Sequence, residues 1–404
     1  MAAAGRGEAG RPGDDVRSDL HAVVELTDGG GLEIEVISKV GSLYGAAIEE
    51  TVQSTLVGLG VEHARVRVDD KGAVPFVIAA RVEAAALRAG VPSRGDARPP
   101  RTTPGRARTA RERLRRSRLY LPGDQPKLQL NAGLHQPDGV ILDLEDSVHA
   151  NQKDTARLVV RNALRCIDFG DAERMVRINQ LPLGLEDLDA IVPERPDLVL
   201  IPKTETADQV ARVDTRIREI LGEPPDGNSP VWIMPILETA LGIESAFEIA
   251  SASPAVVALT IGLEDYTADL GVQKTLEGTE SLYARGRLIN AARAAGVQAI
   301  DSVFGDVGDE DGLRTWASRS RGLGFEGMGC IHPRQIRPIH EAFAPSAGEI
   351  EKALRIVAAF EEAEAKGLGV VSLGTRMVDP PVVLRAQRLV HVARQAGLIE
   401  EPGS

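Results

Sequence analysis

The sequence predicts an α/β protein: a (β/α)8 TIM barrel with a small N-terminal α+β domain and a C-terminal helical lid extension. Eight short, nearly uninterrupted apolar runs alternate with helical stretches over residues 117–345, as expected for parallel strands that are buried on both faces. A Pro- and Arg-rich segment separates this region from an N-terminal part with a different pattern. A doubly wound open sheet is the alternative, but no glycine-rich phosphate loop follows the first run.

The N-terminal part of the chain divides into a tail, a small domain and a linker. Residues 1–19 mix Gly, Arg and Asp without an apolar stretch, which predicts a disordered tail. Residues 20–91 are expected to form the α+β domain in the order ββαβα. Residues 92–116 carry Pro and Arg with almost no bulky apolar residue, so we expect a solvated basic linker. The strands of the small domain are expected at 21–26, 32–37 and 63–68, and its helices at 41–60 and 75–90.

The barrel domain is predicted over residues 117–345 and the C-terminal extension over 346–404. The extension opens with a helix whose start carries a capping-box pair, Ser346 and Glu349. Because a helix after the eighth βα unit is surplus to a barrel, we expect it to pack across a subunit or to carry a lid. The barrel strands are expected at 118–122, 139–146, 175–179, 198–203, 231–238, 256–265, 298–304 and 328–333.

Composition narrows the classes of function. The chain has 404 residues and a formal net charge of −12, which argues against nucleic acid or an anionic membrane as the main partner. Two cysteines cannot build a disulfide framework or a Cys-type zinc site. There is no segment like a signal peptide and no uncharged apolar run of about 18 residues, so we expect a cytoplasmic protein without a membrane span.

Polar side chains follow the predicted strands at their carboxyl ends, where a barrel places its active site. Glu238 and Asp265 end neighbouring strands, so their carboxylates can meet in the barrel mouth. Oxygen ligands without a Cys or His cluster favour Mg²⁺ or Mn²⁺ over zinc. Alternatively, one or both carboxylates only cap the helix that follows. The other candidates on this rim are Asp143, Glu145, Asp146, Arg177, Asn179, Lys203, Asp301 and His332.

Two cations on this rim allow more than one role. Arg177 suits a substrate carboxylate because its planar guanidinium binds in a bidentate manner, but it could instead neutralise Glu145 or Asp146. Lys203 could form a Schiff base with a carbonyl substrate only if an apolar pocket lowered its pKa. Because several carboxylates converge on the same rim, we expect Lys203 to stay protonated and to act through its charge.

Seven sequence motifs, which follow one another along the chain in the same order as in one known family, resemble that family. They match the citrate lyase beta chain family, which includes malyl-CoA and citramalyl-CoA lyases, from about Arg116 to the C-terminus. The resemblance implies a carbon–carbon lyase with Mg²⁺ held by Glu238 and Asp265 and a substrate carboxylate bound by Arg177. The motifs read RRSRLYLPGDQPK, VILDLEDSV, RIN, PILETALGIE, TIGLEDYTADLG, FEGMGCIHPRQI and MVDPPVV.

The resemblance also implies roles for residues around the metal pair. Glu145 and Asp146 match an acidic pair beside the metal-bound water. Asp379 matches a lid residue that such enzymes commonly insert into a neighbouring subunit's site, which implies a homo-oligomer, commonly a trimer or a hexamer.

The opening motif is associated with the phosphates of a thioester carrier such as CoA. Arg116 and Lys127 match it. Where the motif usually continues with Lys-Ala, this chain has Asn131-Ala132.

Residues 20–90 resemble a second family, the acyl carrier (gamma) chain of citrate lyase, through VDDKGAVPFVIAARVEAA and the strands before it. This resemblance implies a phosphoribosyl-dephospho-CoA arm on a serine in a Glu-Ser-x-Asp turn. Here the turn reads Glu25-Leu26-Thr27-Asp28, so Leu26 occupies the serine position and Thr27 is the nearest hydroxyl. Either Thr27 carries the arm, or the domain is a relic that docks, regulates or assembles.

These features together predict a reversible retro-Claisen cleavage of a citryl-, citramalyl- or malyl-type 3-hydroxyacyl thioester. The products would be an acetyl thioester and an α-keto acid. We expect Asp379 or Asp146 to act as the base, and Lys203 and Glu238 to contact the substrate beside Arg177. Two alternatives stay open: the lyase component of a carrier-dependent citrate lyase that needs a partner acyltransferase, and a non-catalytic scaffold.

Overall fold

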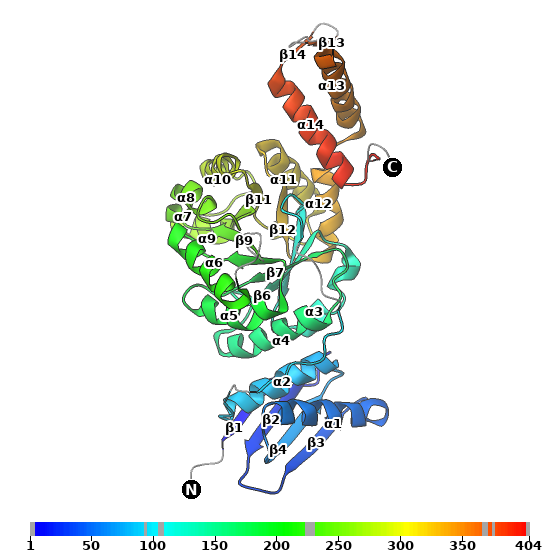
Figure 1. Cartoon of the computed structure of the whole chain (residues 1–404), viewed down its shortest axis with the longest axis vertical. Helices are drawn as coiled ribbons and strands as arrows, with labels where there is room; N and C mark the ends of the chain where they lie inside the picture. Colours follow the sequence, from blue (N-terminus) through cyan, green and yellow to red (C-terminus); the bar gives the residue numbers. More distant parts are fainter. Residues whose placement is uncertain are drawn as a thin grey trace.

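The computed structural model describes residues 5–92, 95–103, 109–222, 231–365, 371–373 and 376–400. Three parts follow one another along the long axis of the molecule: a small sheet domain, a barrel and a helical hairpin (Figure 1). The barrel is therefore held between two smaller parts that come from the two ends of the chain.

The N-terminal domain is a four-stranded sheet with two helices. Alternate residues of β2 are buried, among them Leu20, Ala22 and Val24, because this face of the sheet packs against the helices. The strand order is β1-β2-β4-β3. The elements are β1 (Arg6–Gly10), β2 (Leu20–Leu26), β3 (Leu32–Ser38), α1 (Gly41–Gly58), β4 (Ala64–Asp70) and α2 (Pro75–Arg88).

The expectation of a disordered tail over 1–19 is wrong for the segment Arg6–Gly10. This segment forms β1, which pairs antiparallel with β2 from Arg6 opposite Glu25 to Gly10 opposite His21. A Cβ at Gly7 would lie 2.1 Å from the carbonyl oxygen of Ala85, so the strand can approach α2 only because this residue is glycine. Residues 1–4 lie outside the described residues.

The predicted barrel is present as eight parallel strands that close in the order β10-β11-β12-β5-β6-β7-β8-β9. Each of the eight predicted strands is present, but several end before the last residue that was predicted for them. The polar residues there leave the sheet; Glu264 and Asp265, for example, begin a helix. The strands are β5 (Ser117–Pro122), β6 (Gly139–Asp143), β7 (Glu173–Arg177), β8 (Leu198–Ile201), β9 (Trp232–Leu237), β10 (Ala258–Ile261), β11 (Gln298–Asp301) and β12 (Gly327–Cys330).

Helices surround the barrel, and their apolar sides form one continuous core with the outward-facing strand residues. A separate apolar cluster fills the barrel interior and includes Ile141, Leu200 and Met234. The α-helices are α3 (Pro126–Gln129), α4 (Lys153–Cys166), α5 (Leu183–Ile191), α6 (Ala207–Leu221), α7 (Ala240–Glu244), α8 (Ala246–Ala250), α9 (Leu263–Leu270), α10 (Leu282–Ala295), α11 (Glu310–Leu323) and α12 (Ile336–Phe343). Short 3-10 turns lie at η1 (Ala132–His135), η2 (Ala150–Gln152), η3 (Val192–Glu194) and η4 (Pro333–Gln335).

The expected solvated linker is, over residues 109–116, part of the packed structure. Arg115 is fully buried and forms an ion pair of 2.7 Å with Glu173. Arg111 donates hydrogen bonds to the carbonyl oxygens of Pro254 and Val256. Arginines that look like a solvated tether in composition therefore fasten the chain to the amino-terminal end of the barrel. Residues 93–94 and 104–108 of the predicted linker lie outside the described residues.

The small domain is docked on the barrel through α2 and α4. Phe76 and Val77 of α2 belong to the barrel's apolar core, whereas Leu158 and Val159 of α4 belong to the core of the small domain. The two cores thus interpenetrate at this interface. Such shared burial holds the small domain in one position against the barrel.

The C-terminal extension is a helical hairpin, α13 (Ala347–Ala365) and α14 (Pro380–Gln395), with a short ribbon of β13 (Val371–Leu373) and β14 (Arg376–Val378). The predicted capping box is confirmed, because Ser346 and Glu349 hydrogen-bond each other reciprocally. At the base of the hairpin, Arg388 forms an ion pair of 2.9 Å with Glu326. The tip projects away from the barrel (Figure 1). None of the helices in the described ranges combines the length and apolar character needed to cross a bilayer.

Candidate active site

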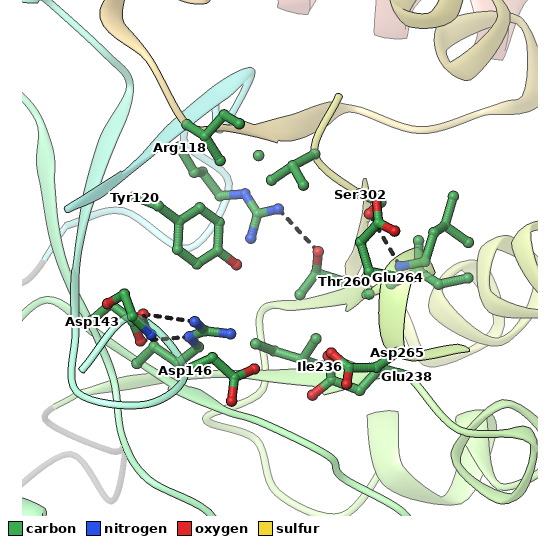
Figure 2. A pocket seen from close by; sticks show the side chains of 18 of the residues that line it. Arg118, Tyr120, Asp143, Asp146, Ile236, Glu238, Thr260, Glu264, Asp265 and Ser302 are labelled. Carbon is green, nitrogen blue, oxygen red and sulfur yellow. Dashed lines mark hydrogen bonds and ion pairs between the residues drawn. The ribbon is translucent and has the colours of Figure 1, made fainter. Parts of the chain in front are cut away.

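A cavity of about 380 Å³ opens at the carboxyl ends of the barrel strands. Its wall combines apolar side chains, such as Ile236 and Ile331, with a concentration of acidic groups (Figure 2). This is the end of a barrel at which active sites form. The acidic residues that line it are Asp143, Asp146, Glu238, Glu264, Asp265 and Asp301, and the lining arginines are Arg118 and Arg177.

Arg177, at the end of β7, is held by two carboxylates from the neighbouring β6 strand and the loop after it. Its guanidinium donates to both oxygens of Asp143, at 2.6 and 2.7 Å, and lies 2.8 Å from Glu145 Oε2. The ring of Tyr120 lies 5.2 Å from the guanidinium carbon. Burial alone would lower the pKa of Arg177, but the bonds to Asp143 raise it above its ordinary value. Arg177 is therefore a fixed cation that also neutralises Glu145, one of the two roles expected from the sequence.

Glu238 brings a buried carboxylate into the mouth from the end of β9. Its Oε1 accepts a hydrogen bond of 2.7 Å from the backbone N–H of Lys203. Its Oε2 lies 2.3 Å from where a Cβ of residue 262 would stand, so Gly262 leaves the space it occupies. Burial, together with the charges of Asp265 and Glu145, raises the pKa of Glu238 to about 8.

Asp265 lies in the first turn of α9, and its side chain is 41% exposed. It lines the cavity from the helix that follows β10, the strand next to that of Glu238. The alternative that these two carboxylates only cap helices finds no support in the hydrogen bonds of the described residues, because neither accepts one from its following helix.

Lys203 lies between the acidic groups. Its ammonium is 3.6 Å from Glu145, 3.6 Å from Asp265 and 4.0 Å from Asp146. Its backbone has φ +45°, a left-handed conformation that is uncommon for a residue with a side chain. Burial opposes protonation, but the carboxylates raise the pKa of Lys203 above its ordinary value. The lysine stays protonated, which disfavours Schiff-base chemistry.

The donor set fits a hard divalent cation. A buried glutamate among like charges is costly unless a cation lies beside it, and oxygen ligands suit Mg²⁺. Within the described ranges, no cluster of three or more His, Cys, Asp or Glu side chains could enclose a metal by itself. Glu238 and Asp265 would therefore leave several coordination positions for water and substrate oxygens.

The other predicted site residues lie in different parts of the structure. Asp146 lines the cavity with a half-exposed side chain. Lys127 is exposed on α3, outside the cavity lining but at the same end of the barrel. Asp379 caps α14, where it accepts a hydrogen bond from Val382, on the projecting hairpin. Thr27 lies in the turn after β2 and donates to the carbonyl oxygen of Gly29.

The structure does not bring Arg116, which the resemblance associates with thioester-carrier phosphates, to this cavity. Arg116 precedes β5, so it lies at the amino-terminal end of the barrel, opposite the cavity. Both sides of its guanidinium are bound by Asp138, at 2.8 and 2.9 Å. Arg116 is thus paired with Asp138 at the amino-terminal end of the barrel, away from the cavity.

Arg118 lines the cavity but is not among the residues predicted from the sequence. Arg118 interrupts the otherwise apolar run of β5, two residues before Tyr120, and both residues line the cavity. An arginine inside a buried barrel strand was the available signal, because alternate strand residues face the same side.

The profile of the HpcH/HpaI aldolase/citrate lyase family matches residues 116–333. The chain belongs to this family. It is 39% identical over 295 residues to the citrate lyase subunit beta of Leuconostoc mesenteroides subsp. cremoris, covering 72% of this chain and 98% of that protein. It is 34% identical to the mitochondrial citramalyl-CoA lyase of Homo sapiens, covering 69% and 85%.

A solved structure of the aldolase/citrate lyase family has the same barrel. CitE from Mycobacterium tuberculosis in complex with magnesium, acetoacetate and coenzyme A superposes with a TM-score of 0.57 at 31% identity, covering 71% of this chain and all of that one. The N-terminal domain is matched separately: the profile of the malonate decarboxylase delta subunit covers residues 13–89. This match confirms the acyl carrier-like character of the small domain that this family member carries.

Proposed function

We propose that this protein is a Mg²⁺-dependent carbon–carbon lyase that cleaves a 3-hydroxyacyl CoA thioester of the citryl, citramalyl or malyl type. The observation that carries the proposal is the pair of Glu238 and Asp265 beside the cations Arg177 and Lys203 in one barrel mouth. Family membership supports it, because a citrate lyase beta subunit and a citramalyl-CoA lyase are among the relatives.

Mg²⁺ held by Glu238 and Asp265 would lower the pKa of the substrate hydroxyl and help to orient the bond that breaks. The chain supplies the surrounding charge. Arg177 is already held by Asp143 and Glu145, so it is fixed in place before a substrate carboxylate arrives. Lys203 carries its ammonium on a flexible four-carbon side chain, so this charge can turn from the carboxylates to a developing negative charge.

Proton transfer needs a carboxylate at the mouth. Asp146, 55% exposed and on the cavity wall, or Asp379 from the hairpin of another subunit, would accept the hydroxyl proton. The electron pair of that O–H bond forms the carbonyl of the keto acid as the C–C bond breaks. The pair from the C–C bond becomes the enolate of the acetyl thioester, whose carbon then takes a proton while the carboxylate gives up the one it accepted, so that no net proton is consumed.

A carrier-dependent citrate lyase, with a partner acyltransferase, is the second candidate, because the small domain is acyl carrier-like. The interpenetrating cores at α2 and α4 favour the CoA enzyme instead, since they pack against the barrel the domain that would have to deliver the acyl arm. We therefore propose that Thr27 bears no phosphoribosyl-dephospho-CoA arm. Intact-mass spectrometry checks this: an added mass on residues 20–90 would favour the carrier route.

The net negative charge and the few cysteines fit a cytoplasmic location.

The deciding experiment measures acetyl-CoA release from malyl-, citramalyl- and citryl-CoA, with and without Mg²⁺. We expect metal-dependent cleavage of at least one ester by the purified chain alone. No cleavage of any ester by correctly folded protein would move the assignment to the carrier-dependent complex or to the non-catalytic scaffold.

Glu238→Ala tests the metal site directly. The variant should bind Mg²⁺ at least ~100-fold more weakly, a larger loss than is typical when only an outer-shell partner is removed. Glu238→Gln is the matched variant, because its amide oxygen can still accept from Lys203 while the charge is gone. Titration calorimetry reports Mg²⁺ affinity and circular dichroism reports folding. Wild-type Mg²⁺ affinity in both variants would rule out Glu238 as a ligand.

A further inference from the structure

Arg118 is a fully buried arginine in the floor of the cavity. Its residue is 1% exposed, near the start of β5, and its side chain lines the cavity together with Tyr120. In Figure 2 its guanidinium points from β5 across the cavity toward Thr260 on β10. A cation in this place is surrounded by the barrel interior and faces the space that a substrate would fill.

The contacts of Arg118 leave its charge uncompensated. Its Nη2 donates to Thr260 Oγ1 at 2.9 Å and more weakly to the carbonyl oxygen of Asp301 at 3.4 Å. Its Nη1 faces only the sulfur of Met234, at 3.0 Å, and its buried Nε has no hydrogen-bond partner. Among the described residues, no carboxylate forms an ion pair with it. The Asp301 carboxylate is bound by Arg285 instead.

The neighbouring cations differ in this respect. Arg177 is bound by two carboxylates, and Lys203 lies within 4.0 Å of three. A buried unpaired charge is costly, and an anion that enters the site removes that cost. Arg118 is thus the cation of this cavity that gains most from an anionic ligand.

The depth of Arg118 indicates which part of a substrate would reach it. Its partner Thr260 stands two residues before Gly262, against which Glu238 rests, and alternate strand residues share a face. Two residues along a strand span roughly 7 Å, so the guanidinium lies one side-chain layer below the metal carboxylates. A short arm on the hydroxyl-bearing carbon of the substrate would extend into this layer.

We propose that Arg118 binds a second carboxylate of the substrate and so selects a 3-hydroxyacyl thioester whose hydroxyl-bearing carbon carries both a carboxylate and a carboxymethyl arm. This is the citryl type, and the inference rests on the proposed lyase function. The citramalyl type has a methyl in place of the arm and the malyl type has hydrogen, so neither offers an anion to Arg118. The oxo-acid product of the preferred reaction is accordingly a dicarboxylate.

The test compares citryl-CoA with citramalyl-CoA in the presence of Mg²⁺. Arg118→Met should shift the ratio of kcat/KM values toward citramalyl-CoA by ~10- to 100-fold, the size expected when a hydrogen-bonded charge pair is lost. Arg118→Lys, which keeps the charge, should recover part of the preference. Arg174→Met is the matched control: it removes another buried arginine, paired with Asp197 outside the cavity, and should leave the ratio unchanged.

Product binding gives a readout that does not need turnover. In titrations with Mg²⁺, oxaloacetate should bind at least ~10-fold more tightly than pyruvate to the wild type, and Arg118→Met should abolish this difference. An equal loss for both esters and both oxo-acids in Arg118→Met would overturn the proposal, as would a wild type that prefers citramalyl-CoA. If the wild type cleaves no ester, the lyase function fails while the binding difference still decides the role of Arg118.

Discussion

His340, on α12, forms polar contacts at the amino-terminal end of the barrel. Its Nε2 lies 2.7 Å from Ser117 Oγ and 3.5 Å from Asp138 Oδ1. Burial lowers the pKa of His340 below its ordinary value, Asp138 opposes this effect and Arg116 adds to it. The unfolded chain then binds the proton more readily than the folded chain, so the free energy of unfolding falls as the pH drops below about 6.5. His340→Gln should reduce this acid-side loss.

Urea denaturation at pH 5.5 and pH 7.5 measures the effect of His340→Gln. The variant should lose less stability than the wild type between the two pH values. His391→Gln, at an exposed position on α14, is the control and should keep the wild-type pH dependence. If His340→Gln lost as much stability on acidification as the wild type, the buried imidazole would not be the group that titrates.

At the scale of elements, a buried ion pair fixes Arg81 of α2 at the edge of the α2–α4 interface. Arg81 of α2 is 1% exposed and donates to both oxygens of Asp19, at 3.0 and 2.8 Å. It also donates to Thr155 of α4 and to the carbonyl oxygen of Asp124, beyond β5. Arg81→Met would leave the Asp19 carboxylate buried and unpaired, so we expect a loss of about 3–5 kcal/mol in the free energy of unfolding.

Chemical denaturation of the full chain checks this expectation. The double variant Arg81→Met/Asp19→Asn should recover much of the stability, because no charge is then left unpaired. Arg65→Met is the control, since its pair with Glu33 is exposed on the sheet and is worth about 0–1 kcal/mol. Equal losses in Arg81→Met and Arg65→Met would mean that the buried pair contributes no more to the stability of the chain than an exposed one.

The sequence was sufficient for the barrel because periodicity and strand ends are local properties. The run that becomes β6 is apolar whatever lies around it, and Asp143 marks its end. β1 could not be predicted from RGEAG, since the strand exists only through backbone pairing with β2 and the close approach of Gly7 to α2.

The partners of the arginines before β5 could not be predicted from the sequence either. Arg115 and Arg116 look alike in the sequence, but their partners, Glu173 and Asp138, come from distant segments. Similarly, the motifs were sufficient to predict that Glu238 and Asp265 share the barrel mouth. The role of Arg118 could not be predicted, because it depends on the groups that β9, β10 and β11 place around its guanidinium.

At the scale of the whole molecule, the hairpin carries Asp379 away from the cavity of its own chain. The tip projects from the barrel (Figure 1), and Asp379 is absent from the residues that line the cavity. Its Oδ1 accepts a hydrogen bond of 3.3 Å from Val382 N–H, but the side chain is exposed. We therefore expect Asp379 to complete a site in another copy of the chain, within a homo-oligomer.

Mixing two inactive variants tests this exchange. Asp379→Asn should lower kcat by ~10²–10⁴, the range for loss of a general base, and Glu238→Ala should be inactive through loss of the metal site. When the two chains are co-expressed, a barrel from the Asp379→Asn chain can receive the intact Asp379 of a Glu238→Ala chain. Activity should then rise well above that of either variant alone. If Asp379 served its own barrel, every site in the mixture would lack one group and no activity would return.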